Sequence, residues 1–150
     1  MFRGQFVHSI DAKGRVSLPA RFREAVLAEG DARIVITPAP FDPCLHLYPL
    51  GHWVEFERKI AELPRFDSHL VRFRRIYVSA ALECEVDGAG RVLIGNDHRE
   101  RARLTKDVLL AGMGRFAEVW SKELWDRVNA PLAPEEQERF MRSVEELIKI

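Results

Sequence analysis

Two short stretches of the chain combine an aspartate, a glycine and an arginine at the same spacing. The first runs over residues 11–15 and the second, from Asp87 to Arg91, lies 76 positions later. An aspartate that opens a turn can accept hydrogen bonds from backbone N–H groups two or three residues on. It can also pair with the arginine four positions later, which would hold the guanidinium in one orientation. Each stretch is therefore expected to present one arginine on a closed turn.

The basic side chains of these turns have the chemistry of a DNA-contacting surface. Arg15 and Arg91 could contact phosphates or the edges of guanine bases, and Lys13 adds a charge at the tip of the first turn. Residues 1–23, which include Arg3, carry five basic side chains and one acidic one. A phosphate-binding face needs such a local excess here, because the formal net charge of the whole chain is zero.

The second turn has an alanine where the first has its lysine, so we expect the first turn to contribute more to binding. Gly14 and Gly90 are expected to allow the positive φ that a tight connection requires. A second interpretation stays open, in which Asp11–Arg15 and Asp87–Arg91 only close their turns and contact nothing else.

The sequence offers no pattern typical of catalysis or of a bound cofactor. The five histidines have no metal-ligand spacing, and the two cysteines are isolated. No glycine-rich phosphate loop follows a predicted strand, and no nucleophile elbow is present. We therefore predict a protein that is not an enzyme and that has no catalytic residue, cofactor, metal ligand or small-molecule substrate.

The turns belong to a larger repeat, which covers residues 1–60 and again residues 81–130. Each copy is predicted as strand, turn, strand, short helix, two further strands and a closing helix. In the first copy the strands are expected at 6–10, 15–18, 33–37 and 45–48, and the helices at 21–27 and 50–62. In the second copy the strands are expected at 82–86, 91–94, 107–111 and 116–120. Its helices are expected at 96–104 and after Ser121.

Local signals fix some details of these elements. The first two strands of the chain are expected to form a hairpin with each other. Pro19 can occupy the first turn of the following helix, and Gly30 is a plausible end for it. Asn96 or Asp97 can cap the corresponding helix of the second copy, and Ser121 can cap the last helix of that copy.

Two segments have no counterpart in the repeat and are expected to be helical. Residues 61–80 connect the copies, and residues 131–150 form a C-terminal helix. One face of that last helix carries an apolar stripe, made of Phe140, Met141, Val144, Leu147 and Ile148. The stripe could pack against its own domain or contact another subunit, and both readings stay open.

Composition sets the broad class of the chain. Its 150 residues, 47% of them hydrophobic, suffice for one core built from two half-domains. No apolar run is long enough for a membrane span, and the first residues lack the apolar core of a signal peptide. Two isolated cysteines suit a reducing compartment. We expect a soluble, cytosolic protein without a membrane partner.

Residues 1–4 and 11–23 closely resemble the start of the bacterial MraZ proteins, and the turn at 87–91 lies where that family has its second one. The resemblance implies an α+β fold of the AbrB-like swapped-hairpin superfamily. In that fold the two tandem strand-turn-strand-helix repeats interleave into one pseudo-twofold, barrel-like domain with packed helices. We expect both turns on one face of it.

The resemblance also implies a cytoplasmic, nucleoid-associated transcriptional regulator that binds double-stranded DNA. Members bind short direct repeats upstream of their own gene, at the head of the division and cell-wall gene cluster, and assemble into homo-oligomeric rings. The family's DNA-contact turns fall on Asp11, Lys13, Gly14 and Arg15, and on Asp87, Gly90 and Arg91. Arg3 completes the set of candidate DNA-binding residues. The chain departs from the family pattern at 95–98, where a proline-containing helix start is usual.

Two other functions remain as alternatives. One is an oligomeric scaffold that binds another protein, and the other is an antitoxin-like regulator that binds DNA and neutralises a toxin. A disordered C-terminal tail would favour the antitoxin, whereas residues 131–150 are apolar and periodic.

Overall fold

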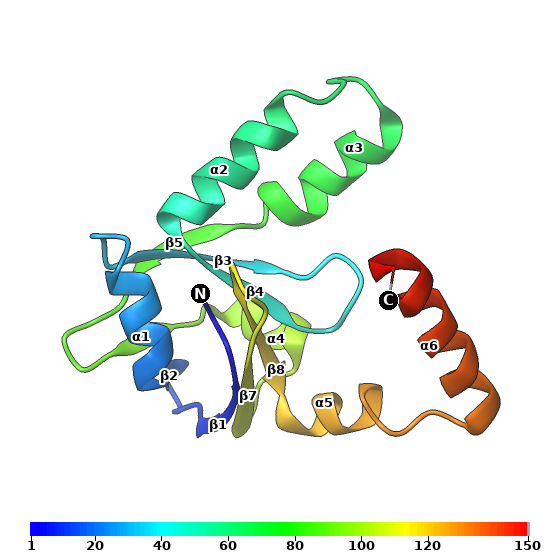
Figure 1. Ribbon diagram of the computed structural model, residues 1–150. Helices are drawn as coiled ribbons and strands as arrows, with labels where there is room; N and C mark the ends of the chain where they lie inside the picture. Colours follow the sequence, from blue (N-terminus) through cyan, green and yellow to red (C-terminus); the bar gives the residue numbers. More distant parts are fainter. Residues whose placement is uncertain (150) are drawn as a thin grey trace.

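The structure is a computed structural model and describes residues 1–149. Its strands are β1 (Gln5–Ser9), β2 (Arg15–Ser17), β3 (Arg33–Pro38), β4 (Leu45–Pro49), β5 (Leu82–Glu85), β6 (Arg91–Leu93), β7 (Asp107–Gly112) and β8 (Ala117–Ser121). Its helices are α1 (Ala20–Leu27), α2 (Leu50–Ala61), α3 (Ser68–Phe73), the π-helical turn η1 (Arg74–Val78), α4 (Asn96–Ala102), α5 (Lys122–Val128) and α6 (Pro134–Ile148). Figure 1 shows α2 and α3 as a pair on one side of the sheet and α6 apart from it.

Strand pairing follows the same rule in both copies of the repeat. The larger sheet has the order β1-β7-β8-β4-β3-β5, and every pairing in it is antiparallel. The first strand of each copy pairs with the third strand of the other copy, as β1 with β7 and β5 with β3. The fourth strands, β4 and β8, form the central pair. Exchanging the two copies therefore leaves the order of the sheet unchanged.

The second strands pair with each other in a separate two-stranded ribbon. In this ribbon β2 runs antiparallel to β6, and Val16 lies opposite Val92. These valines are equivalent positions of the two copies, because they are separated by the same 76 residues as Asp11 and Asp87. The centre of the ribbon and the centre of the sheet thus mark one approximate twofold axis. The pairing interleaves the two copies.

The predicted hairpin between the first two strands is wrong. Within residues 1–149, their backbones are connected only by the isolated bridge from Ile10 to Val16 and by the bond from Asp11 N to Arg15 O, beside a side-chain contact of His8 Nδ1 with Ser17 O at 2.5 Å. The remaining bonds of β1 go to β7, a strand with four consecutive buried residues. The local sequence predicts that a strand and a turn form. Which strand pairs with β1 depends instead on which apolar surfaces the fold must cover.

The main core lies on the inner face of the sheet. Alternate residues of the strands point into it, together with Val16 and Val92 from the ribbon. From α1, the fully buried ring of Phe22 packs edge-on against Phe2 and Phe6, at centroid distances of 5.2 and 5.3 Å. The helix α1 therefore anchors the N-terminal segment and β1 to this core.

Two smaller clusters cover the outer face of the sheet. Over β3 and β4, a cluster that includes Val35, Tyr48 and Tyr77 joins the sheet to α2, α3 and η1. Over β7 and β8, Leu109 and Trp120 pack with Leu124 of α5. Of the connecting segment 61–80, which the sequence predicts to be helical, residues 68–78 form α3 and η1.

The helix starts agree only partly with the sequence. Ser121 caps α5, since its Oγ accepts a hydrogen bond from Leu124 N at 3.4 Å. Pro19 stands one residue before α1 as its N-cap, not within the first turn. The prediction that Asn96 or Asp97 caps α4 is wrong, because Gly95 holds that position without a side-chain bond. Instead, Ile94 N donates to Gly14 O at 2.8 Å, so the other copy directs the chain into α4.

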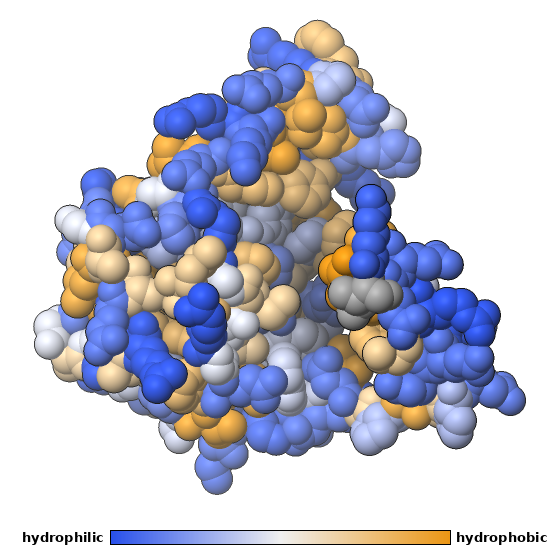
Figure 2. Space-filling view, viewed as in Figure 1, coloured by the Kyte–Doolittle hydropathy of each residue, from blue (hydrophilic) through white to orange (hydrophobic). Residues whose placement is uncertain are grey.

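The apolar stripe of α6 is not buried by the rest of the chain. Phe140, Met141, Leu147 and Ile148 are all exposed, with Leu147 at 82%. None of the residues described in α6 is buried. Figure 2 shows apolar surface on the side of α6 that faces the body of the molecule. Of the two interpretations of the stripe, packing within its own domain is not observed among residues 1–149, where only Val144 of the stripe is half-buried.

Each helix within residues 1–149 is too short or too polar to cross a membrane.

Candidate nucleic-acid interface

The first turn is closed by the side chain of Asp11. Its Oδ1 accepts hydrogen bonds from Lys13 N and Arg15 N, both at 2.9 Å, and its Oδ2 accepts one from Arg15 Nε at 2.7 Å. Gly14 has a φ of +89° and donates its N–H to Asp11 O. The terminal nitrogens of Arg15 have no hydrogen-bond partner among residues 1–149. The guanidinium is thus oriented through Nε while its outer edge stays available.

The second turn repeats this arrangement atom for atom. Asp87 Oδ1 accepts from Ala89 N and Arg91 N at 2.9 Å, and Asp87 Oδ2 accepts from Arg91 Nε at 3.0 Å. Gly90 has a φ of +78°. Both turns therefore confirm the expected pair with the arginine and the bond from the N–H two residues on; the second backbone donor stands four residues on, not three.

Both turn carboxylates are stabilised in their charged form. The pKa of Asp11 is lowered from 3.8 to about 2, first by the backbone N–H of Arg15 and then by its guanidinium. The pKa of Asp87 is lowered as well, chiefly by the backbone N–H of Arg91. Hydrogen bonds to the charged form of a carboxylate favour that form. The turns therefore keep their ionised aspartates throughout the neutral pH range.

The two arginines project from the same side of the ribbon. Successive side chains of a strand alternate between faces, and Val16 and Val92 point into the core. Arg15 and Arg91 flank these valines and so point outward, with side-chain exposures of 34% and 36%. From strand geometry their Cα atoms lie roughly 8 Å apart. The turns begin at opposite ends of the ribbon, but their arginines meet on one exposed face.

Each turn is supported by the other copy of the repeat. Leu18 N donates to Gly90 O at 2.9 Å, which is the counterpart of the bond from Ile94 N to Gly14 O. Gly90 lies against the side chain of Arg23 from α1, and Gly14 lies against Arg99 from α4. The absence of a Cβ at both glycines makes these close approaches possible.

Arg23 and Arg99 were not among the predicted site residues. They are themselves 76 positions apart, and each stands beside the turn of the opposite copy. The shared offset is the signal that could have found them. Their place beside the opposite turn could not be read from the sequence, because it depends on how the copies interleave.

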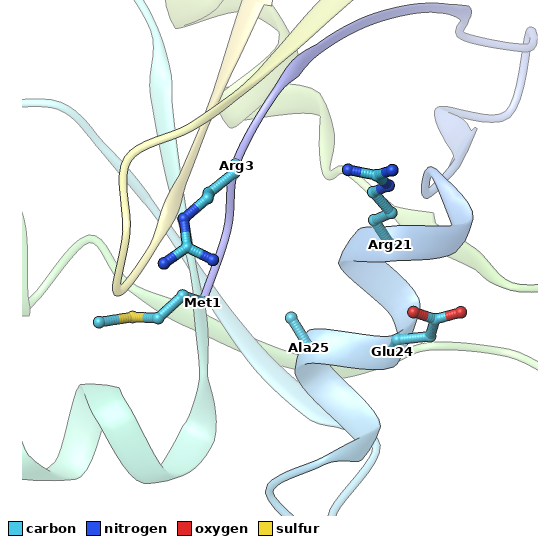
Figure 3. Close-up of a pocket in the computed structure, with 5 residues that line it drawn as sticks. All are labelled: Met1, Arg3, Arg21, Glu24 and Ala25. Atoms are coloured by element: carbon cyan, nitrogen blue, oxygen red, sulfur yellow. The ribbon is translucent and has the colours of Figure 1, made fainter.

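The remaining predicted residues lie in different places. Lys13 is exposed at the tip of the first turn. Arg3 precedes β1 whereas Asp11 follows it, so the structure does not bring Arg3 to the turns. Figure 3 shows Arg3 on one side of a shallow pocket of about 360 Å³, with Arg21 of α1 across from it. Arg3 therefore belongs to a second, smaller basic patch.

Comparison with known proteins identifies the class of this chain. The sequence pattern described as "MraZ protein, putative antitoxin-like" matches twice, over residues 1–76 and 77–147. A relative from Desulforamulus reducens is 46% identical over 87% of this chain and 88% of its own. One from Marinomonas sp. is 44% identical over 84% and 83%, and one from Azotobacter vinelandii is 40% identical over 92% and 91%.

All three relatives carry the name "Transcriptional regulator MraZ". The class is therefore that of transcriptional regulators, which are not enzymes. The chain belongs to the MraZ family. The resemblance seen in the sequence is confirmed, and so is the prediction of a non-enzymatic protein.

Proposed function

We propose that the exposed face of the β2–β6 ribbon binds double-stranded DNA in a sequence-specific way. The observation that carries the proposal is the pair of outward arginines, each oriented by an aspartate through Nε. A guanidinium held this way presents its two terminal nitrogens in a fixed plane. That geometry suits bidentate contacts to a phosphate or to guanine O6 and N7.

Each residue of the site has a defined role in this proposal. Arg15 and Arg91 contact phosphates or bases, and Lys13 adds a phosphate contact beside the first turn. Asp11 and Asp87 orient the arginines, and Gly14 and Gly90 permit the close approach of the opposite copy. Arg3 lies away from the turns and would contact the DNA backbone at the edge of the interface.

The architecture behind this face is that of an AbrB-like swapped hairpin, in our proposal. Two observations support it. Each of β1 and β5 pairs with a strand of the other copy, and the second strands of the two copies, β2 and β6, pair with each other. In this description residues 1–60 and 81–130 form the interleaved repeats, residues 61–80 connect them through α3 and η1, and the segment from residue 131 onward contains the C-terminal helix α6.

A single chain should bind one short DNA site weakly, because two turns neutralise few phosphates and the protein has no net charge. We infer that several copies assemble into a ring and bind direct repeats in the promoter of their own gene, ahead of the division and cell-wall genes. Linked binding can raise avidity by roughly 10²–10⁴ without any new contact. The exposed stripe of α6 supports self-association, since an apolar face of this kind is normally covered. Such a regulator works in the cytoplasm, associated with the nucleoid.

The same stripe also supports a second function, that of an oligomeric scaffold or antitoxin-like module. The family description includes the words "antitoxin-like", and an exposed amphipathic helix can dock into a groove of a partner protein. The ribbon face distinguishes the DNA-binding regulator from the scaffold, because a purely protein-binding module would not need it. The antitoxin-like module would bind DNA as well; a disordered C-terminal tail would favour it, whereas Pro134–Ile148 forms the helix α6.

Fluorescence anisotropy with DNA from upstream of the gene tests the proposal. The wild type should bind this DNA better than a shuffled duplex of equal length. The double variant Arg15→Ala/Arg91→Ala should lose that preference. The matched control Arg127→Ala removes an exposed arginine of α5 and should bind as the wild type does. If the double variant also binds like the wild type, the ribbon is not the interface.

A further inference from the structure

A cluster of three metal-ligand side chains lies on the outer face of the sheet, away from the turns. His46 of β4 stands directly opposite Glu118 of β8 in the central strand pair. Cys44, at the end of the β3–β4 loop, extends toward the same carboxylate. The potential ligand atoms of the three residues all lie within 4.8 Å of one another.

The distances in the cluster fit a tetrahedral metal ion. Cys44 Sγ lies 3.8 Å from Glu118 Oε2, and His46 Nε2 lies 3.6 Å from the same oxygen. Zinc bonds of about 2.3 Å to sulfur and about 2.1 Å to nitrogen and oxygen, at tetrahedral angles, separate these ligand pairs by about 3.6 and 3.4 Å. The two pairs that include Glu118 would each contract by about 0.2 Å. The Cys44 and His46 ligand atoms, which lie within 4.8 Å of each other, would approach to about 3.6 Å on one zinc ion.

Outer contacts hold the imidazole and the carboxylate in place. His46 Nδ1 lies 2.6 Å from the hydroxyl of Tyr77, which in turn lies 2.7 Å from the hydroxyl of Tyr48. If Nδ1 carries the proton, the lone pair of Nε2 points toward the cluster. The other oxygen of Glu118 accepts a hydrogen bond from Trp120 Nε1 at 3.1 Å. Outer hydrogen bonds of this kind orient metal ligands in proteins.

The environment favours one class of metal. Cys44 is 3% exposed, and the side chains of His46 and Glu118 are 13% and 12% exposed. One sulfur, one nitrogen and one oxygen ligand suit Zn²⁺, Co²⁺ or Cu²⁺ and do not suit Mg²⁺ or Ca²⁺. Burial raises the pKa of the Cys44 thiol, so the metal must replace its proton. On binding, the S–H proton passes to solvent and the thiolate lone pair forms the metal–sulfur bond.

We propose that Cys44, His46 and Glu118 form a binding site for Zn²⁺ or a similar thiophilic divalent ion, with a water molecule as the fourth ligand. The ligands come from both copies of the repeat, at the central strand pair of the sheet. A bound metal therefore links the two copies across β4 and β8, which share only three residue pairs. This proposal differs from the metal-free protein that the sequence predicts.

The sequence could not show this site. Cys44 and His46 are two positions apart, whereas Glu118 follows 72 positions after His46. Only the register between β4 and β8 brings the carboxylate opposite the imidazole. The alternative is a hydrogen-bonded polar cluster that binds no metal.

Titration of the reduced, tag-free protein with Co²⁺ tests the proposal. Cobalt bound to a thiolate in a tetrahedral site gives a charge-transfer band and intense visible bands. We expect both to saturate at one Co²⁺ per chain and to be displaced by Zn²⁺. Zn²⁺ should also raise the melting temperature, while an equal concentration of Mg²⁺ should not.

Variants assign the site to its residues. Cys44→Ser should abolish the charge-transfer band, and His46→Gln should weaken cobalt binding at least tenfold. Cys84→Ser is the matched control, because it removes the other cysteine, on β5 away from the cluster, and should change neither result. Circular dichroism checks that each variant is folded. A second measurement compares the Zn²⁺ affinities of folded wild type and folded His46→Gln, and the wild type should bind more tightly. This measurement does not use the thiolate charge-transfer band.

Two results would overturn the proposal. One is a wild type that gives no saturable cobalt spectrum and no change of melting temperature with Zn²⁺. This result would show that the three side chains form a hydrogen-bonded cluster only. The other is a charge-transfer band that persists in Cys44→Ser or disappears in Cys84→Ser.

Discussion

Replacing Arg15 by alanine should remove one phosphate contact from each DNA-bound chain. Asp11 binds only the Nε atom of the Arg15 guanidinium. The two terminal nitrogen atoms remain available on the exposed face of the ribbon. The pair with Asp11 is itself solvent-exposed, and exposed ion pairs contribute little to stability. The variant should therefore fold with nearly the same melting temperature while its DNA affinity falls.

The size of the effect follows from counterion release. Each neutralised phosphate changes the slope of log K against log salt by about 0.9. Between 50 and 200 mM salt, one lost contact therefore changes the ratio of wild-type to variant affinity by about 3.5-fold, the variant being the less salt-sensitive. If Arg15 instead contacts a guanine, the slope stays nearly constant. Discrimination at one base pair then falls by about 1–3 kcal/mol.

The assay is fluorescence anisotropy over a series of salt concentrations, with a duplex that carries a single site. Arg91→Ala should act in the same direction but more weakly, because Ala89 stands where the first turn has Lys13. Arg127→Ala on α5 controls for the loss of one exposed charge. An Arg15→Ala variant with unchanged affinity, slope and base preference would show that the turn is only a structural closure.

Four further outcomes are expected. Gly14→Ala should destabilise the protein by about 1–3 kcal/mol or more in urea unfolding. The effect should exceed that of Gly90→Ala, because a Cβ at position 14 would meet the backbone oxygen of Ile94, whereas a Cβ at position 90 would meet the movable side chain of Arg23. The pKa of Asp11 in the folded protein is about 2, below its ordinary 3.8. The ionised carboxylate therefore stabilises the folded protein above pH 3.8, and this contribution is lost as the pH falls toward 2. Asp11→Asn should make the stability of the protein less dependent on pH in acid unfolding. Phe140→Ser with Leu147→Ser on α6 should lower the oligomer size in sedimentation, and an unchanged size would exclude the stripe as the contact. Phe22→Ala should cost about 3–5 kcal/mol in urea unfolding, since the ring is fully buried.

The two turns could be predicted from the sequence because their chemistry is local. Every bond that closes the first turn joins residues of the segment 11–15, so five residues contain the whole motif. The cap at Ser121 is local in the same way and is also confirmed. The apolar stripe of α6 was visible as a periodicity, but only the fold could show that the chain leaves it exposed.

Features that depend on how the two copies interleave could not be predicted. The partner of β1 is β7, about a hundred residues away, and nothing within residues 6–18 specifies it. The place of Arg23 beside the second turn has the same origin. So does the start of α4, where a bond from the opposite copy replaces a capping side chain. In each case two distant segments fit together, and neither segment carries the information alone.

Footprinting on the DNA upstream of the gene is the most direct test of the central claim, that the ribbon face reads DNA. The wild type should protect regularly spaced repeats, and Arg127→Ala should give the same pattern. Arg15→Ala/Arg91→Ala should lose the pattern while remaining folded and keeping the wild-type oligomer size. Full, regularly spaced protection by that folded double variant would contradict the account.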